Sequence, residues 1–393
     1  MTTAIGVKDI VSDCPTKHWE AGNSSRPPRI LLGQLGANGD CLFATAIARQ
    51  IKTDYPGCHL TWAIGSAYRS VLNGNPFVDE VWEIPVANHQ ELWDKWEQFE
   101  KEAFARKKSG DFDEVFLTQI PPNNFKNFDG TVRASIFRGY TKPITESVAP
   151  VVRLSPVEIE NTRGFVETHH LAEKKYVILF ECAPSSAQSF VTPEFAIEVA
   201  QKLIRMVPDV CVILSSNLPM PSTNTNIIDG STLSFRENAE LTKYCTLVVG
   251  CSSGISWLCT SDWAKPIPMV QLLAKDKSVY ASFIHDYEYR KVASDSLIEM
   301  TDGSADKVSK CLATIFEDGF NNARLIFNER IPLRFNFYIS ALYCYLVIRG
   351  KHRDALISLK HTIGRYGLHP HLLLCILRML GRYILWLIFG RRS

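Results

Sequence analysis

The sequence lacks the signatures of several protein classes. Its 393 residues carry 43 Lys and Arg against 41 Asp and Glu, so the formal net charge is only +2. Dedicated nucleic-acid binders usually show a clear basic excess, and we therefore expect no nucleic-acid partner. The eleven cysteines form no CxxC pair and no Cys/His cluster with zinc spacing. This scatter argues against a zinc module and favours buried, reduced thiols in a cytosolic protein.

We also expect neither a secretory leader nor a helix that spans a membrane. Its first residues have no basic start followed by an apolar core. The one long apolar run, residues 372–390, holds Arg378 and Arg382 near its middle. Each arginine would cost about 2.5–3.5 kcal/mol at the centre of a spanning helix. We therefore expect a helix in the membrane interface, anchored by Tyr383 and Trp386, with packing on the protein body as the alternative.

The small net charge hides an uneven distribution. Residues 351–393 hold eight basic side chains and one acidic side chain, a charge of +7, whereas the remaining residues carry −5. A mildly acidic body therefore ends in a basic, apolar tail. We expect this tail to attract an anionic membrane surface.

Apolar runs alternate with helical patterns along most of the chain. Strand-like runs at 59–65 and 79–85 flank helical patterns, and the rhythm restarts at 175 after a loop-rich stretch from 119 to 170. Such alternation predicts α/β domains with parallel sheets. The expected organisation is an N-terminal lead-in (1–28), two doubly wound, Rossmann-like domains (29–165 and 166–305) and a C-terminal helical region ending in the basic amphipathic tail (306–393).

The loop after the first apolar run contains three evenly spaced glycines. Gly33, Gly36 and Gly39 match neither the dinucleotide fingerprint nor a P-loop. Ligands in such domains bind at the carboxyl ends of the strands, so we expect Gly36, Asn38 and Gly39 to lie beside a ligand, which the family resemblance given below identifies as the acceptor. Asp40 opens the next helix, where it is either a helix-capping acid or a general base.

This part of the chain resembles a known family. Residues 29–85 contain an apolar strand, LGxxGD, a helix with small residues, a YP turn, a second strand and NPxVDEV. The segment is similar to the N-terminal signature of glycosyltransferase family 9, which includes the ADP-heptose:lipopolysaccharide heptosyltransferases. The resemblance implies a GT-B fold, with an acceptor-side domain followed by a nucleotide-sugar-side domain across a cleft. It also implies that Asp40 is the catalytic base.

The second half offers a first polar loop for a donor. Ser185, Ser186 and Gln188 follow the run YVILFEC and precede a helix. Their N–H and O–H groups suit phosphate oxygens, although an ordinary capped loop has the same composition. By the resemblance, Gln188 stands where the family has a donor-contacting Lys.

A second polar loop follows the run TLVV and opens another helix. The backbone N–H groups of Ser253 and Gly254 would face the diphosphate of a nucleotide sugar, with Ser256 beside them. The loop resembles the family motif D-[ST]-G-x-x-H, but Ser252 replaces the Asp and Trp257 replaces the His. Trp257 is either a stacking platform or part of the core.

These features predict an inverting, metal-independent glycosyltransferase. It would move a sugar, heptose or another, from a nucleotide diphosphate donor to a glycolipid or polysaccharide acceptor, as in lipopolysaccharide or surface-glycan assembly. We expect no cofactor and no metal, because no DxD follows a strand on the donor side. We expect a cytoplasmic protein, peripheral at the inner face of the cytoplasmic membrane. The alternative is a catalytically inactive GT-B binding or scaffold protein, which the departures at Gln188, Ser252 and Trp257 suggest.

Overall fold

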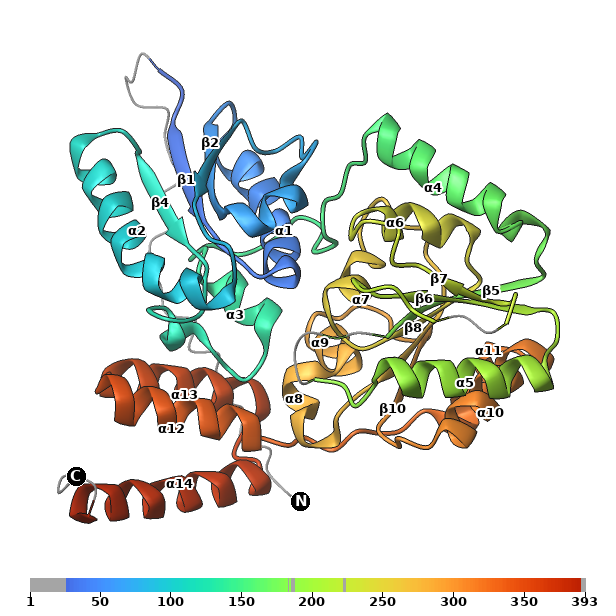
Figure 1. Ribbon diagram of the computed structural model, residues 1–393. Coiled ribbons are helices and arrows are strands. Elements are labelled where there is room, and N and C mark those ends of the chain that lie inside the picture. The colour runs from blue at the N-terminus through green and yellow to red at the C-terminus, as the bar shows by residue number, and fades with distance from the viewer. Residues whose placement is uncertain (1–25, 183, 185–187, 222–223, 390–393) are drawn as a thin grey trace, which may run out of the picture.

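The structure is a computed structural model that describes residues 26–182, 184, 188–221 and 224–389 (Figure 1). Two α/β domains lie side by side, and a layer of C-terminal helices lies beneath the first domain. Each domain is built on a parallel sheet, as the alternation of apolar runs and helical patterns predicts.

The first domain contains a four-stranded parallel sheet in the order β3-β2-β1-β4. Its strands are β1 (Arg29–Gly33), β2 (His59–Gly65), β3 (Glu80–Ile84) and β4 (Glu114–Leu117). Both faces of the sheet are covered, because Ile30 and Leu32 pack with α1 (Asn38–Asp54) while Leu31 packs with α2 (His89–Ser109). The alternation along β1 therefore produces a doubly wound layer, with the loop between β1 and α1 at the carboxyl edge.

The second domain contains a six-stranded parallel sheet in the order β10-β9-β8-β5-β6-β7. Its strands are β5 (Tyr176–Glu181), β6 (Val210–Ser215), β7 (Ile227–Asp229), β8 (Leu247–Gly250), β9 (Met269–Leu272) and β10 (Leu297–Met300). One face packs with α5 (Pro193–Met206) and α10 (Ala305–Glu317). The other face packs with α6 (Glu237–Leu241) and α7 (Gly254–Leu258), the helices nearer the first domain (Figure 1).

The boundary between the domains lies earlier than residue 165. The loop-rich stretch contains α3 (Val132–Arg138) and α4 (Pro156–Thr168), and α4 packs against α6 of the second domain. A local signal for α4 was present in the sequence, because Ser155 and Glu158 form a capping box with Pro156 as the first helical residue. The expected first domain therefore loses α4 to the second.

The C-terminal region also divides differently from the expectation. Helices α10 and α11 (Phe320–Phe327) complete the second domain instead of starting a separate region at residue 306. The chain then crosses back, and α12 (Asn336–Arg349), α13 (His352–Tyr366) and α14 (Pro370–Phe389) lie under the first domain (Figure 1). Ser358 of α13 fixes this placement by donating a hydrogen bond to the carbonyl of Phe128 at 2.6 Å.

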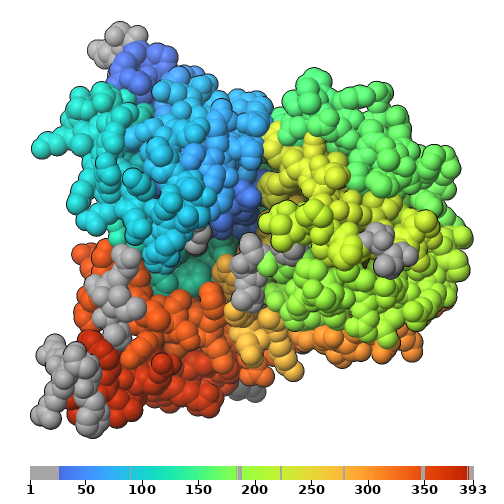
Figure 2. Space-filling model, viewed as in Figure 1, coloured from blue at the N-terminus to red at the C-terminus, as the bar shows by residue number. Residues whose placement is uncertain are grey.

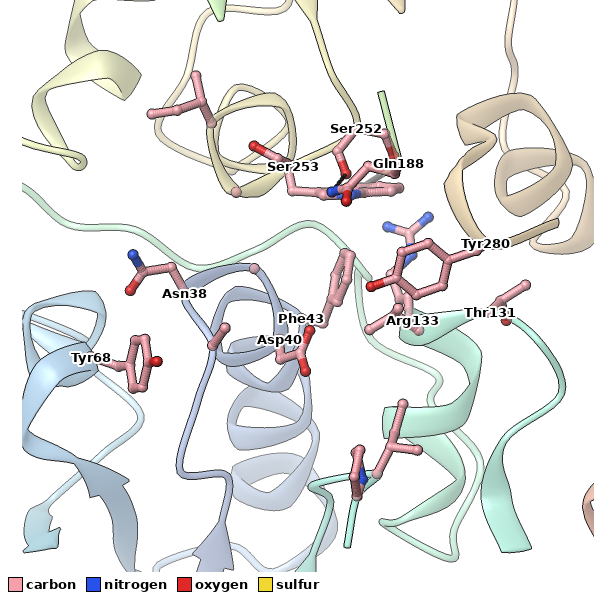
Figure 3. A pocket seen from close by; sticks show the side chains of 18 of the residues that line it. Asn38, Asp40, Phe43, Tyr68, Thr131, Arg133, Gln188, Ser252, Ser253 and Tyr280 are labelled. Carbon is pink, nitrogen blue, oxygen red and sulfur yellow. Dashed lines mark hydrogen bonds between the residues drawn. The ribbon is translucent and has the colours of Figure 1, made fainter. Parts of the chain in front are cut away.

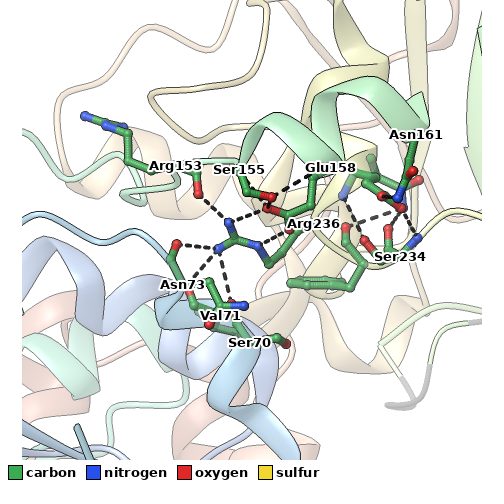
Figure 4. A network of polar contacts seen from close by, with 12 residues as sticks. Ser70, Val71, Asn73, Arg153, Ser155, Glu158, Asn161, Ser234 and Arg236 are labelled. Atoms are coloured by element: carbon green, nitrogen blue, oxygen red, sulfur yellow. Dashed lines mark hydrogen bonds and ion pairs between the residues drawn. The ribbon is translucent and has the colours of Figure 1, made fainter. Parts of the chain in front are cut away.

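A buried arginine joins the two domains on the side away from the C-terminal helices (Figure 4). Arg236 precedes α6, is 4% exposed and donates to the carboxylate of Glu158 on α4 at 2.7 Å. It also donates to the first-domain carbonyls of Ser70 at 3.1 Å and Asn73 at 2.9 Å, and to that of Arg153. One guanidinium thus fixes the second domain against the first, which sets the geometry of the space between them.

The cysteines behave largely as the sequence predicts. All ten within the described residues are free thiols, and nine of them are buried. The exception is Cys344, which is exposed on α12.

Candidate functional site

A cleft of about 1230 Å³ lies between the two domains and the C-terminal helices. Figure 2 shows these three parts of the chain meeting. The glycine loop that leads to Asp40 and the second polar loop, around Ser253, both line the cleft. Its volume exceeds the roughly 300–1,000 Å³ of a pocket for one small ligand.

Asp40 lies in the first turn of α1 and faces the cleft (Figure 3). It is not the helix cap, because Ala37 occupies that position and accepts a 2.8 Å hydrogen bond from the backbone of Cys41. No hydrogen bond or ion pair within the described residues engages the Asp40 carboxylate. Burial raises its pKa from 3.8 to about 7. An unpartnered carboxylate that titrates near neutrality has the properties of a general base.

A buried amide pair shapes the loop before Asp40. Gln34 donates to the carbonyl of Gly36 and to Gln119, each at 2.8 Å, and the Gly36 N–H donates to Gln119 at 3.1 Å. Gly36 does not line the cleft, and a Cβ there would lie 2.4 Å from the ring of Tyr68. The structure therefore gives Gly36 a packing role, whereas Asn38 and Gly39 do lie at the cleft.

The glycine loop before α1 and the second polar loop meet across the domain boundary. A Cβ on Gly39 would lie 3.8 Å from the Cα of Gly254, so the starts of α1 and α7 face each other closely. Next to them, the rings of Phe43 and Trp257 meet edge to face with centroids 4.8 Å apart. Figure 3 shows Asp40 on one side of the cleft and Ser252, Ser253 and Gln188 on the other. Groups bound at the two loops would thus lie close together.

A buried carboxylate that the sequence analysis missed organises the second loop. Glu181, the last residue of β5, accepts from the hydroxyl of Ser253 and, at 2.5 Å, from that of Ser256. The Cys251 N–H donates to the same carboxylate at 2.8 Å. Its signal was an acid at the end of an otherwise apolar strand, because a buried charge needs several partners.

The remaining groups of this loop divide into occupied and available donors. Ser252 donates its hydroxyl to the carbonyl of Ala281 at 2.5 Å. The first hydrogen bond of α7 runs from Trp257 to Ser253, so the helix provides no acceptor for the N–H groups of Ser253 and Gly254. Because α7 has only five residues, its dipole adds little to these two N–H groups.

The first polar loop is only partly described. Ser185 and Ser186 lie outside the described residues. Gln188 is buried and donates to the carbonyl of Ser252 at 2.9 Å. Its amide oxygen is buried and has no hydrogen-bond partner in the described part of the chain, although other atoms of the residue line the cleft.

Trp257 packs between protein groups. Its ring stacks on Phe283 with centroids 3.7 Å apart and planes 12° apart, and the guanidinium of Arg133 lies 4.9 Å over it. Since Phe283 covers one face and Arg133 the other, the structure favours the core alternative over a platform for a base. Arg133 of α3 is a further residue that the sequence analysis missed, because α3 lay in the stretch interpreted as loops. It is 4% exposed and forms an ion pair with Asp286.

The cleft carries few charges for its size. Among the described lining residues only Asp40, Arg133, Glu181 and Asp286 are charged, one cation against three acids. The Tyr280 phenol also lies at the cleft. Burial raises its pKa, and the negative charge of Asp40 raises it further. Within the described residues, no three or more His, Cys, Asp or Glu side chains cluster in a way that could hold a metal ion.

Solved structures with a similar fold are known. No protein-family model matches the chain, and no curated protein matches it in sequence. A family 9 glycosyltransferase from Veillonella parvula DSM 2008 is similar in structure, with a TM-score of 0.50 and 14% identity over 84% of this chain and 97% of that one. The ADP-heptose lipopolysaccharide heptosyltransferase II of E. coli gives 0.46 and 14% over 76% and 99% of the two chains. A UDP-N-acetylglucosamine 2-epimerase gives 0.38 and 9% over 84% and 98%.

The fold is therefore GT-B, as the sequence resemblance implied: two parallel-sheet domains face each other across a cleft. The chain resembles a family 9 glycosyltransferase in this fold as well as in residues 29–85. A fold of this kind hosts more than one chemistry, so the reaction has to be argued from the cleft.

Proposed function

We propose that the protein is an inverting glycosyltransferase that uses a nucleotide-sugar donor, with Asp40 as its general base. The observation that carries the proposal is the position of Asp40. Its unpartnered carboxylate faces the same cleft as the free N–H groups of Ser253 and Gly254. A pKa of about 7 lets the carboxylate accept a proton near neutral pH.

The reaction would be a single displacement. The acceptor hydroxyl lies beside Asp40, and its oxygen attacks the anomeric carbon as Asp40 takes the proton. The bond between that carbon and the diphosphate breaks on the opposite face, which inverts the anomeric configuration. The N–H groups of Ser253 and Gly254 stabilise the charge that develops on the leaving diphosphate. The proposal assigns this task to backbone donors and requires neither a metal ion nor a cofactor.

A binding or scaffold protein without activity is the second candidate. Glu181 supports it, because this carboxylate engages the hydroxyls of Ser253 and Ser256 and lines the cleft near the proposed diphosphate position. The cation at the cleft, Arg133, is already paired with Asp286. A negative charge beside a diphosphate opposes its binding.

Titration with nucleotide diphosphates and nucleotide sugars separates the two candidates. We expect at least one of them to raise the unfolding temperature of the full chain, because a ligand that binds only the folded state stabilises it by mass action. Transfer is then measured with that donor. If none of the nucleotides binds, the glycosyltransferase proposal fails and the scaffold remains.

We propose in addition that α14 holds the protein on an anionic membrane surface, at the inner face of the cytoplasmic membrane. Within the described residues no helix meets the length and hydropathy needed to cross a membrane. One stripe of α14, made of Leu372, Cys375 and Met379, is buried in the protein core. The opposite stripe is exposed, with Leu377 at 66% and Ile384 at 54%. The helix therefore packs on the body with one face and offers apolar side chains on the other.

The flanks of α14 complete this amphipathic arrangement. Arg378 and Arg382 are exposed between the two stripes, and Arg382 lies over the ring of Tyr343. The expected anchors lie elsewhere, because Tyr383 contacts His352 of α13 and stacks on Trp386. Exposed leucines and isoleucines, flanked by arginines, would thus enter the interface in place of the aromatic pair.

Liposome flotation tests this surface. The double variant Leu377→Asp/Ile384→Asp should lose most binding to vesicles that contain an anionic phospholipid, because two carboxylates would have to enter the apolar boundary. The matched control is Leu325→Asp/Ile326→Asp on α11, since both of these side chains are also strongly exposed. If the two double variants float equally well, α14 is not the surface that binds the membrane.

A further inference from the structure

The cleft has two chemically different ends. The end next to α7 is polar, with serine and asparagine side chains from the second domain. The end between β4 and the C-terminal helices is apolar. Its wall is formed by Ile120, Phe125, Phe128, Phe337, Ala341 and Tyr345.

The apolar wall is a packed unit that spans two parts of the chain. The rings of Phe125 and Tyr345 stack with centroids 4.5 Å apart, and Phe125 contacts Phe128 at 5.3 Å. The Tyr345 hydroxyl is occupied, because it donates to the carbonyl of Pro122 at 3.1 Å. The wall therefore presents carbon surface to the cleft, with its polar group already satisfied.

The described lining residues offer few groups that bind anions. Lys277 lies near the wall, with its ammonium 5.3 Å over the ring of Phe337, but it is not one of the lining residues. The one cation among the described lining residues is Arg133, which is buried and paired with Asp286. The other charges at the cleft, those of Asp40, Glu181 and Asp286, are acidic. A phosphorylated or carboxylated acceptor would meet repulsion here, whereas a neutral apolar group would meet a matching surface.

We propose that the acceptor is a neutral hydroxyl carried on an apolar chain, and that this chain lies along the wall formed by Phe125, Ala341 and Tyr345. The inference rests on the proposed function and names its acceptor class. The fold favours a membrane lipid as the molecule that carries this hydroxyl. Helix α12 places Ala341 and Tyr345 at the cleft and also contacts α14. The exposed apolar stripe of α14 then lies within the same group of helices as the acceptor wall.

Alkyl β-glucosides of increasing chain length provide the probe, each used below its critical micelle concentration. Binding to the full chain is measured calorimetrically without any nucleotide. The affinity should rise about three- to fourfold for each added methylene while the chain still lies against the wall. A phenyl β-glucoside distinguishes an aromatic acceptor from an alkyl one, and should bind more weakly than the longest alkyl member. A glucose phosphate should bind more weakly than the neutral butyl glucoside.

Variants on α12 locate the binding. Ala341→Trp fills the apolar end and should make the affinity independent of chain length, and Ala341→Leu should shorten the chain length at which the affinity stops rising. Ser340→Trp is the matched control, because Ser340 is exposed on the same helix and does not line the cleft. The unfolding temperature of each variant without ligand shows whether it folds.

The outcomes separate this inference from the proposed function. Asp40→Asn should keep the chain-length dependence, because it removes the base and leaves the wall. Two results would overturn the apolar site. One is an affinity for alkyl glucosides that does not change with chain length in the unmodified protein. The other is a chain-length dependence that is unchanged in Ala341→Trp and Ala341→Leu. Nucleotide-sugar binding alongside a flat series would leave the transferase proposal standing with a different acceptor. If the affinity depends on chain length but no nucleotide binds, the apolar site stands and the transferase proposal fails.

Discussion

Replacing Asp40 with Asn should have opposite effects on activity and on stability. The substitution keeps the size of the side chain and removes its charge and its basicity. If Asp40 takes the acceptor proton, the rate of transfer should fall by about 10²–10⁴-fold, the usual contribution of a general base. The unmodified protein should also lose activity as the pH falls through about 7, because protonation of Asp40 removes the base.

The stability effect follows from the same pKa. In the folded protein the pKa is about 7 and the ordinary value is 3.8, so the folded state holds the proton more tightly than the unfolded state. Ionisation of Asp40 therefore destabilises the fold increasingly as the pH rises from 3.8 to about 7. A shift of this size corresponds to about 4 kcal/mol at most. Because the side chain is partly exposed to the cleft, we expect about 2 kcal/mol.

Urea denaturation of both proteins at about pH 4 and about pH 8 measures this difference. Asp40→Asn should be as stable as the unmodified protein at the lower pH and more stable at the higher one. The matched control is Asp209→Asn, because that side chain is exposed just before β6, whose other end, at Ser215, lines the cleft. A variant with full turnover would refute the catalytic role. Equal stability at both pH values would refute the raised pKa and leave the catalytic role to be judged from activity alone.

Two further substitutions test the frame of the cleft. Arg236→Ala should lower the free energy of unfolding by about 3 kcal/mol, because Glu158 and several first-domain carbonyls would lose their hydrogen-bond donor. Burial opposes ionisation of Glu158, but hydrogen bonds from Arg236 and Ser155 hold its pKa below 4.5. The loss, measured by urea denaturation, should therefore shrink as the pH falls below that value; a loss independent of pH would contradict the pairing. Trp257→Phe should lower stability by about 1–2 kcal/mol and change nucleotide affinity less than twofold, because both ring faces contact protein groups. A large loss of nucleotide affinity by calorimetry would instead show that the indole contacts the donor.

The parts of the fold that the sequence predicted are those with local signals. Strand β2 has the predicted bounds 59–65. The helix expected after the first polar loop is α5, where a cap at Thr192 and Pro193 as the first helical residue agree with the apolar pattern. Helix α3 was missed, since prolines and glycines around it suggested loops and it is only seven residues long. The strands β7 and β10 were also missed, because three or four residues are too few to show a period.

The site shows the same division. The two loops around Asp40 and Ser253 were found from short motifs, and the fold brings both to one cleft. Glu181 was missed because its role depends on donors that come from a loop 70 residues further along the chain. Arg133 was missed for a similar reason, since its partner Asp286 is 153 residues away and on the other domain. Side chains whose roles depend on distant partners leave no pattern in the nearby sequence.

The charge distribution gains a physical meaning from the placement of the C-terminal helices. The +7 tail is attached to the part of the protein that closes the apolar end of the cleft, while the cleft itself is lined by more acids than bases. Electrostatic attraction to a membrane would therefore act at α14, and the acceptor would be selected by a different rule, apolar contact, at α12. Under both proposals, anionic headgroups would attract the tail but would be repelled from the cleft, so the protein would bind a charged surface and accept an uncharged hydroxyl from it. A neutral lipid in an anionic bilayer satisfies both conditions, whereas a soluble phosphorylated glycan satisfies neither.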